Sequence, residues 1–202
     1  MESGHWLRDK VLLSFDCVYI GAGMNDFEYL FSFYALLLGL SVANVASGFG
    51  DMWRERHAMP VGVCTPLLGL VVLAGGMNVW VRYWHTQHDV HFSPWWLLSA
   101  VGVTVPFIFV SRAMFPTASE PMSLEDHYMT QRKVLLLALT MPPCVSALSN
   151  LLAGNLYSGW PGVWMALRIA APLALIPVNS RIVQRIGLSL LVGLLVIGMF
   201  RW

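Results

Sequence analysis

Long apolar segments separated by short polar ones run along most of the chain. The first of them covers residues 27–50 and carries only one charge, Glu28, at its start. A helix needs about 20 predominantly apolar residues to cross the hydrocarbon core of a bilayer. This segment is therefore predicted to be a transmembrane helix.

Five further segments follow the same pattern. Ser123 is placed to cap a helix whose first turn holds Glu125 and Asp126. That helix is expected to run into the fourth span, where Pro142 and Pro143 should break or bend it. A basic loop is expected at 179–185, and the last span is of marginal length. The predicted spans after the first are 60–80, 94–112, 123–152, 161–178 and 186–202.

The composition agrees with this pattern. The chain has 202 residues, of which 57% are hydrophobic and 11% charged, whereas soluble domains carry about 25% charged residues. The net charge of +1 gives no reason to expect a nucleic-acid partner. We therefore expect an all-α integral membrane protein whose surroundings are the lipid bilayer. Residues 27–202 should form one bundle of about six transmembrane helices, and residues 1–26 an interfacial segment or one that lies before the true start.

The distribution of lysine and arginine predicts the orientation, because cytoplasmic loops are enriched in both. The first, third and fifth loops should accordingly lie in the cytoplasm, with both ends of the chain outside. Residues 1–26 oppose this bias with Arg8 and Lys10. The cations of the odd loops are Arg54, Arg56, Arg112, Arg132, Lys133, Arg181 and Arg185, against Arg82 and Arg201 elsewhere.

Two stretches carry a resemblance to a known group of proteins. They are FEYLFSFYALLLGLSVANVASG, from Phe27, and LEDHYMTQRK, from Leu124. Both resemble segments of a family of uncharacterised multi-span bacterial inner-membrane proteins. The resemblance implies a six-span protein of a bacterial inner membrane, and it implies no chemistry.

The first span also carries a stripe of small residues. Ala35, Gly39, Ala43 and Ser47 recur at every fourth position, which puts them on one helix face and lets another helix backbone approach closely. Asn44 lies beside this stripe. We therefore predict that this face packs against another helix, either of this chain, of a second copy or of a partner membrane protein.

A histidine-rich loop follows the second span. His85, His88, Asp89 and His91 could bring imidazole and carboxylate ligands together, which suits zinc or another divalent metal. The alternatives are a pH-sensing loop and a polar interfacial loop in contact with water or lipid headgroups. We expect the last of these, and hence no bound metal or other cofactor.

Arg168 lies within the fifth predicted span. Eight residues separate it from Trp160, which is about 12 Å along a helix. A charge at that depth costs free energy unless it is paired or reaches water. It could snorkel to the interface, pair with an acid, for which Glu28 is the predicted partner, or belong to a substrate or ion site. Asn44, Asn78 and Asn150 could join it in one polar centre or simply hold helices together.

Motifs of known enzymes are absent from the sequence: it has no Gly-x-Ser-x-Gly, His-Glu-x-x-His, phosphate loop or Cys-x-x-Cys. The chain is therefore expected not to be an enzyme. An accessory or assembly component of the membrane is the first hypothesis. The second is a small channel or transporter with Arg168 at its polar site, and the third is a metal-dependent membrane enzyme that uses the histidine loop.

Overall fold

The computed structural model describes residues 26–54, 62–85, 94–116, 123–152, 154 and 159–200. These residues form six α-helices and no strand. The helices are α2 (Asp26–Arg54), α3 (Cys64–His85), α4 (Pro94–Ala113), α5 (Leu124–Leu152), α6 (Trp160–Leu175) and α7 (Arg181–Met199).

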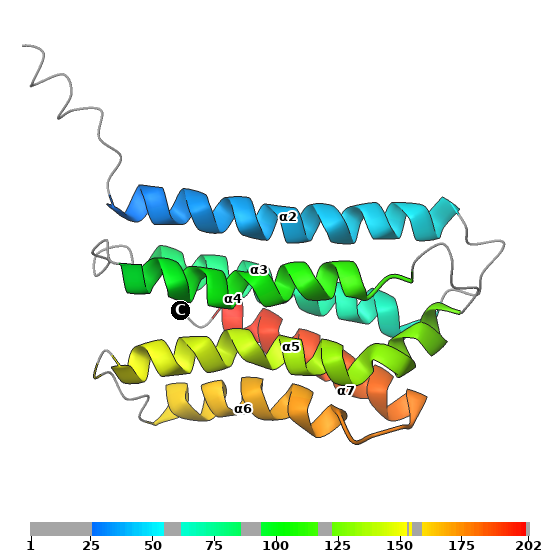
Figure 1. Ribbon diagram of the computed structural model, residues 1–202. Coiled ribbons are helices and arrows are strands. Elements are labelled where there is room, and N and C mark those ends of the chain that lie inside the picture. The colour runs from blue at the N-terminus through cyan, green and yellow to red at the C-terminus, as the bar shows by residue number, and fades with distance from the viewer. Residues whose placement is uncertain are drawn as a thin grey trace, which may run out of the picture.

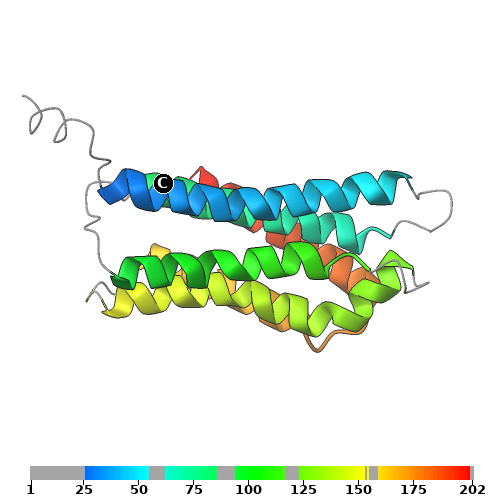
Figure 2. The same ribbon diagram turned by 45° about the horizontal axis from the view of Figure 1, so that its top comes forward.

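Consecutive helices run in opposite directions (Figure 1). The helices α2, α4 and α6 therefore finish at the end of the bundle where α3, α5 and α7 begin. This end is called the basic end below, because Arg54, Arg112 and Arg181 lie at helix ends there. Figure 2 shows the first turn of α2 and the last turn of α7 at the opposite end. The described helix ends on either side of the three odd loops thus lie at one end of the bundle.

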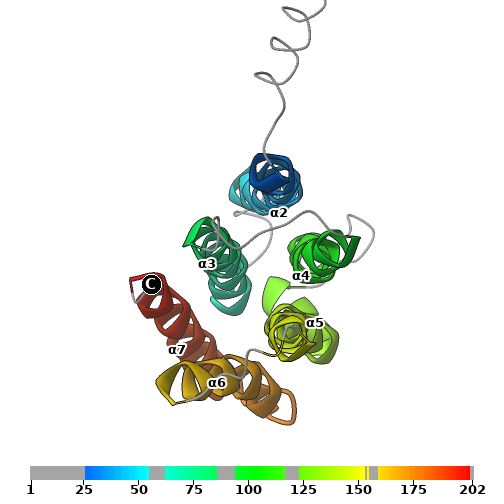
Figure 3. The same cartoon turned by 90° about the vertical axis from the view of Figure 1, so that its left-hand side faces the viewer.

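Seen along its length, the bundle places α2 and α6 on opposite sides, with α3, α4, α5 and α7 between them (Figure 3). Helix α2 packs against α3 and α4, whereas α6 packs against α5 and α7. Leu68, Leu135 and Leu188, from α3, α5 and α7, are fully buried in the middle. At the end opposite the basic end, aromatic rings join α2 to α3, with the rings of Tyr34 and Tyr83 4.4 Å apart between centroids.

Five of the six helices are long and apolar enough to cross a membrane, and α6, with 16 residues, is shorter. The predicted all-α bundle of a multi-span membrane protein is confirmed. The prediction that the last span is the marginal one is wrong, because α7 has 19 residues and begins at Arg181. Helix α6 ends at Leu175, and the next residue, Ile176, still has helical dihedral angles (φ −57°, ψ −49°).

Two further predictions are corrected. Residues 181–185 belong to α7, so the basic loop predicted at 179–185 is reduced to a turn and an extended segment over 176–180. Of the predicted break or bend in α5, the break is wrong, since the helix continues from Leu124 to Leu152 through Pro142 and Pro143. Both prolines are buried inside the bundle, where neighbouring helices hold the backbone in place.

Candidate functional site

Helix α2 buries one side in the bundle, and the small residues of its stripe lie mostly on the other side, where Leu36 and Leu40 are also exposed. Gly39, Ala43 and Ser47 are exposed and Ala35 is half-buried. No atom of the described residues lies within 4 Å of the position that a Cβ on Gly39 would occupy. The prediction that the stripe packs against another helix of this chain is therefore wrong, while packing against a second copy or a partner stays a prediction. The side of α2 that is buried consists of Phe27, Leu30, Tyr34, Leu38, Ser41 and Val45.

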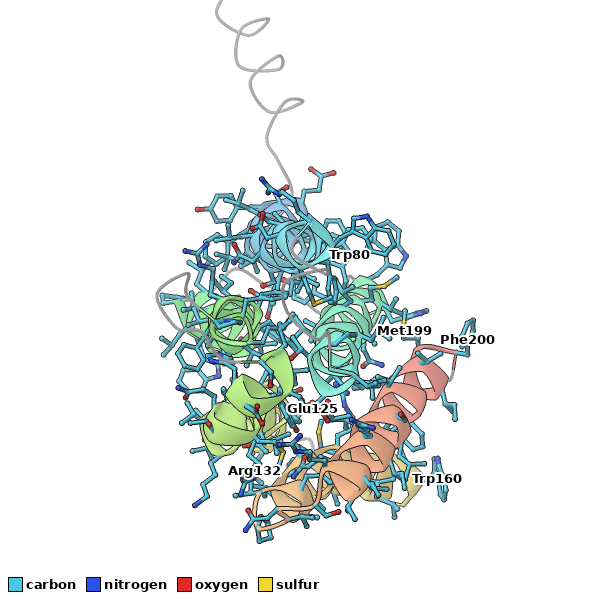
Figure 4. All side chains as sticks on the ribbon, turned by 90° about the vertical axis from the view of Figure 1, so that its right-hand side faces the viewer. Trp80, Glu125, Arg132, Trp160, Met199 and Phe200 are labelled. Carbon is cyan, nitrogen blue, oxygen red and sulfur yellow. The ribbon has the colours of Figure 1, made fainter. Side chains whose placement is uncertain are left out.

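A groove runs beside this face, between α2 and α3. Its volume is about 380 Å³. Gly39 and Gly76 contribute no side chain to its walls, and Trp80 also lines it. Figure 4 labels Trp80 next to α2. Ser41 carries the one hydroxyl among the residues that line the groove. This hydroxyl donates to the carbonyl of Leu37 within α2, so the groove offers an apolar surface.

The three amides predicted to join a polar centre are held at separate places. The Asn44 Nδ2 donates to the Ser111 Oγ, 3.2 Å away on α4. The Asn78 Nδ2 donates to the carbonyl of Leu195 on α7 over 3.0 Å, and the Asn150 Nδ2 donates to the Ser146 carbonyl in its own helix. Asn44 and Asn78 therefore join pairs of helices, the second of their two predicted roles.

A polar cluster lies at the basic end, where the first turns of α5 meet α7. Its central contact joins the Glu125 carboxylate, 7% exposed, to the Arg185 guanidinium. The Arg185 Nε and Nη2 donate to Oε1 over 3.1 and 2.7 Å, and Nη2 lies 2.9 Å from Oε2. The Cys64 thiol donates to the same Oε1 over 3.7 Å. Figure 4 shows Glu125 between α5 and α7.

A second contact of this cluster is carried by Gln184, which is fully buried. The Tyr128 hydroxyl donates to the Gln184 Oε1 over 2.8 Å. The Gln184 Nε2 in turn donates to the carbonyls of Leu175 and Val178, at 2.6 and 2.8 Å. One side chain thus ties α5, the end of α6 and the start of α7 together.

Other polar residues of the LEDHYMTQRK stretch also bind neighbouring elements. Asp126 pairs with Arg181 over 2.7 Å. The His127 Nε2 lies 3.1 Å from the Ala113 carbonyl of α4, and Arg132 donates to Asn179. This stretch is therefore the junction of four helices at the basic end, a role that sequence reasoning missed. The available signal was a pair of adjacent acids on one helix and two arginines four residues apart on another.

Arg168 lies inside the bundle and is 8% exposed. It lines a cavity of about 30 Å³ to which α3, α4, α5, α6 and α7 all contribute. Glu28 lies on α2 and is exposed, and Figure 3 shows α2 and α6 on opposite sides of the bundle. The predicted pair between Glu28 and Arg168 is therefore wrong. The order of the helices explains this result, because α2 packs against α3 and α4 whereas α6 packs against α5 and α7.

The histidine loop is described only at its beginning. His85 is the last residue of α3 and is exposed, whereas His88, Asp89 and His91 lie outside the described residues. Within the ranges that the structure describes, no three His, Cys, Asp or Glu side chains lie close enough to hold a metal ion. The loop's role therefore stays a hypothesis.

Comparison with known proteins adds no relative: no family model, no curated protein and no solved structure matches the chain. The resemblance to bacterial inner-membrane proteins therefore stays a prediction. What the fold defines is a class: a helical membrane protein with several spans.

Proposed function

We propose that this protein is a noncatalytic accessory or assembly component of a membrane, and that it holds a transmembrane helix of a partner against the outer face of α2. The supporting observation is that the small residues of α2 face away from the bundle. In lipid, helices associate through close backbone contacts at such residues, because lipid tails are as apolar as leucine and no hydrophobic drive exists. None of the described helices covers this face, which is open to a second helix.

The polar side chains of the interior agree with this proposal. The amides of Asn44, Asn78 and Gln184 are engaged in contacts between helices or with helix ends. Glu125 is held by Arg185. These groups stabilise one arrangement of helices and are not gathered around a common reaction site, so we propose that the protein is not an enzyme.

We further propose that the membrane is a bacterial inner membrane, with the basic end of the bundle in the cytoplasm. The structure supports this orientation by the positions of the arginines. Arg54, Arg112, Arg181 and Arg185 lie at the basic end, whereas Arg82 lies in the last turn of α3, at the other end.

Replacing Gly39 by Ile tests the proposed use of the α2 face. Because no described atom lies near the Gly39 Cβ position, the variant should keep the thermal stability of the native protein in detergent. It should nevertheless lose its partner, seen as a smaller hydrodynamic size after mild solubilisation of native membranes. A native-like size for Gly39→Ile would contradict the proposal.

The matched control is Gly69→Ile on α3. A Cβ on Gly69 would lie 2.6 Å from the Phe49 ring and 3.2 Å from the Met114 side chain. This variant should lose stability, since overpacking a filled interior costs about 1–3 kcal/mol. The pair of variants therefore separates a defect of association from a defect of folding.

A small channel or transporter is the second candidate, and Arg168 favours it. Arg168 is buried in the bundle, and charged residues that face a bundle interior often mark an ion or substrate path. Solute flux into vesicles that contain the purified protein tests this candidate. Flux that is lost in Arg168→Met would favour transport over the accessory role.

A further inference from the structure

The described cations at the basic end fall into two groups. The first group is engaged by carboxylates, an amide or the backbone and consists of Arg54, Arg132, Arg181 and Arg185. The second group is Arg112, in the last turn of α4, and Lys133, which follows Arg132 on α5; Figure 4 labels Arg132 at this end. Both side chains are exposed, and within the part of the chain that the structure describes neither forms a hydrogen bond or an ion pair. The described residues therefore leave the charges of Arg112 and Lys133 without a counter-charge.

Both of these cations lie where an uncharged stretch of helix meets a charged one. Residues 94–111 precede Arg112, residues 134–152 follow Lys133, and neither stretch contains a charged side chain. Each is close in length to the roughly 20 apolar residues that cross the hydrocarbon core of a bilayer. The two cations are therefore at the level of the lipid headgroups, on the side of the membrane that the basic end faces.

Each cation also continues an exposed apolar face of its own helix, because residues three or four positions apart share one side of a helix. Helices α4 and α5 pack against each other and lie side by side along one flank of the bundle (Figure 3). This α4/α5 flank consists of Arg112, Phe109 and Val105 of α4 and Lys133, Leu137 and Met141 of α5, all of them exposed. A charged position at headgroup level is thus followed, toward the membrane centre, by apolar positions that lipid chains can contact.

We propose that the α4/α5 flank binds anionic phospholipids. Their phosphate groups contact Arg112 and Lys133, and their acyl chains lie along the apolar residues of the flank. The argument is charge complementarity, because lysine and arginine near the membrane surface attract anionic lipids, whereas a zwitterionic lipid carries no net charge. The apolar residues alone would accept any acyl chain, so the two cations provide the selectivity. This inference does not depend on a partner at the outer face of α2, since the flank belongs to α4 and α5.

Photoactivatable lipids test the proposal with the whole protein in phosphatidylcholine vesicles. Parallel samples contain a trace of phosphatidylglycerol or of phosphatidylcholine with a diazirine in its acyl chain, and mass spectrometry locates the adducts. The ratio of anionic to zwitterionic adducts should be several-fold higher on the α4/α5 flank than at Leu190 and Ile197, which are exposed on α7. The difference should shrink in high salt, which screens exposed charges. Equal ratios on the two faces would overturn the proposal.

Substitutions assign the selectivity to the two cations. Arg112→Gln and Lys133→Gln should each lower the ratio on the flank, and the double variant should bring it to the value on α7. Lys133→Arg keeps the charge and should keep the ratio. The matched control is Arg54→Gln, which removes one positive charge from the same end of the bundle, but from an arginine already paired with Asp51. All three positions are exposed, so the variants should fold. A ratio that survives in the double variant, or that Arg54→Gln lowers equally, would refute the site.

Discussion

Replacing Gln184 by Met should strongly destabilise the bundle. The substitution keeps an unbranched side chain of similar length but removes one acceptor and two donated hydrogen bonds. It leaves the Tyr128 hydroxyl, on a residue 1% exposed, without its acceptor. It also frees the carbonyls of Leu175 and Val178, where the chain passes from α6 to α7.

The magnitude follows from these three bonds. Hydrogen bonds between helices in membranes contribute about 0.6 kcal/mol each on average and at most about 1.7 kcal/mol. Three of them give a loss in the free energy of unfolding of about 2 kcal/mol, with an upper bound of about 5 kcal/mol. Tyr128→Phe removes one bond and should cost about 0.6 kcal/mol.

The assay is reversible unfolding in mixed micelles, measured for both single variants and for the double variant. Tyr128→Phe should add little once Gln184 is methionine, since the bond is then already absent. Gln131→Met is the control, because Gln131 lies on the exposed side of α5 and such changes usually stay within about 0.5 kcal/mol. The reasoning fails if Gln184→Met loses no more free energy of unfolding than Gln131→Met. It also fails if the losses of Gln184→Met and Tyr128→Phe are additive in the double variant.

Three further predictions concern the basic end, the orientation and the histidine loop. Gly62→Ala should destabilise by about 1–3 kcal/mol through overpacking, because its Cβ would lie 2.6 Å from the Glu125 Cβ and 3.2 Å from the Glu125 Cα. Thermal unfolding checks this, and a native-like midpoint would refute the close packing. In a cysteine-free background in intact cells, an impermeant maleimide should label Gly154→Cys but not Ser180→Cys, which lies at the basic end; the reverse pattern would invert the orientation. Elemental analysis of purified protein should find well under one equivalent of zinc, iron or copper, and a stoichiometric metal that is lost in His85→Ala would revive the enzyme hypothesis.

Local patterns were sufficient to predict the helices, because each span needs about 20 apolar residues and these runs are visible in the sequence. The Ser123 cap and the start of α5 were also predicted, and the Ser123 hydroxyl accepts from the Asp126 N–H over 3.2 Å. The predicted basic loop at 179–185 misses the start of α7, because Arg181 and Arg185 are charged residues that belong to the helix. Both lie in the first turns of a helix whose apolar run begins later.

The contacts between helices could not be predicted from one sequence. Glu125 and Arg185 are 60 positions apart, and nothing local indicates which acid an arginine meets. The choice of Glu28 as a partner for Arg168 rested on depth alone, whereas the order of helices around the bundle decides which faces meet. The outward direction of the α2 stripe depended on the same order, because α2 meets its neighbours through Tyr34, Leu38 and Val45.

Photocrosslinking in native membranes tests the central claim most directly. A benzophenone amino acid at Ala43, on the outward stripe, is compared with one at Leu190, an exposed position on α7. The account predicts a discrete protein adduct from Ala43 that disappears when Gly39→Ile is added, and none from Leu190. Only lipid adducts at both positions, or an adduct from Ala43 that Gly39→Ile leaves unchanged, would contradict it.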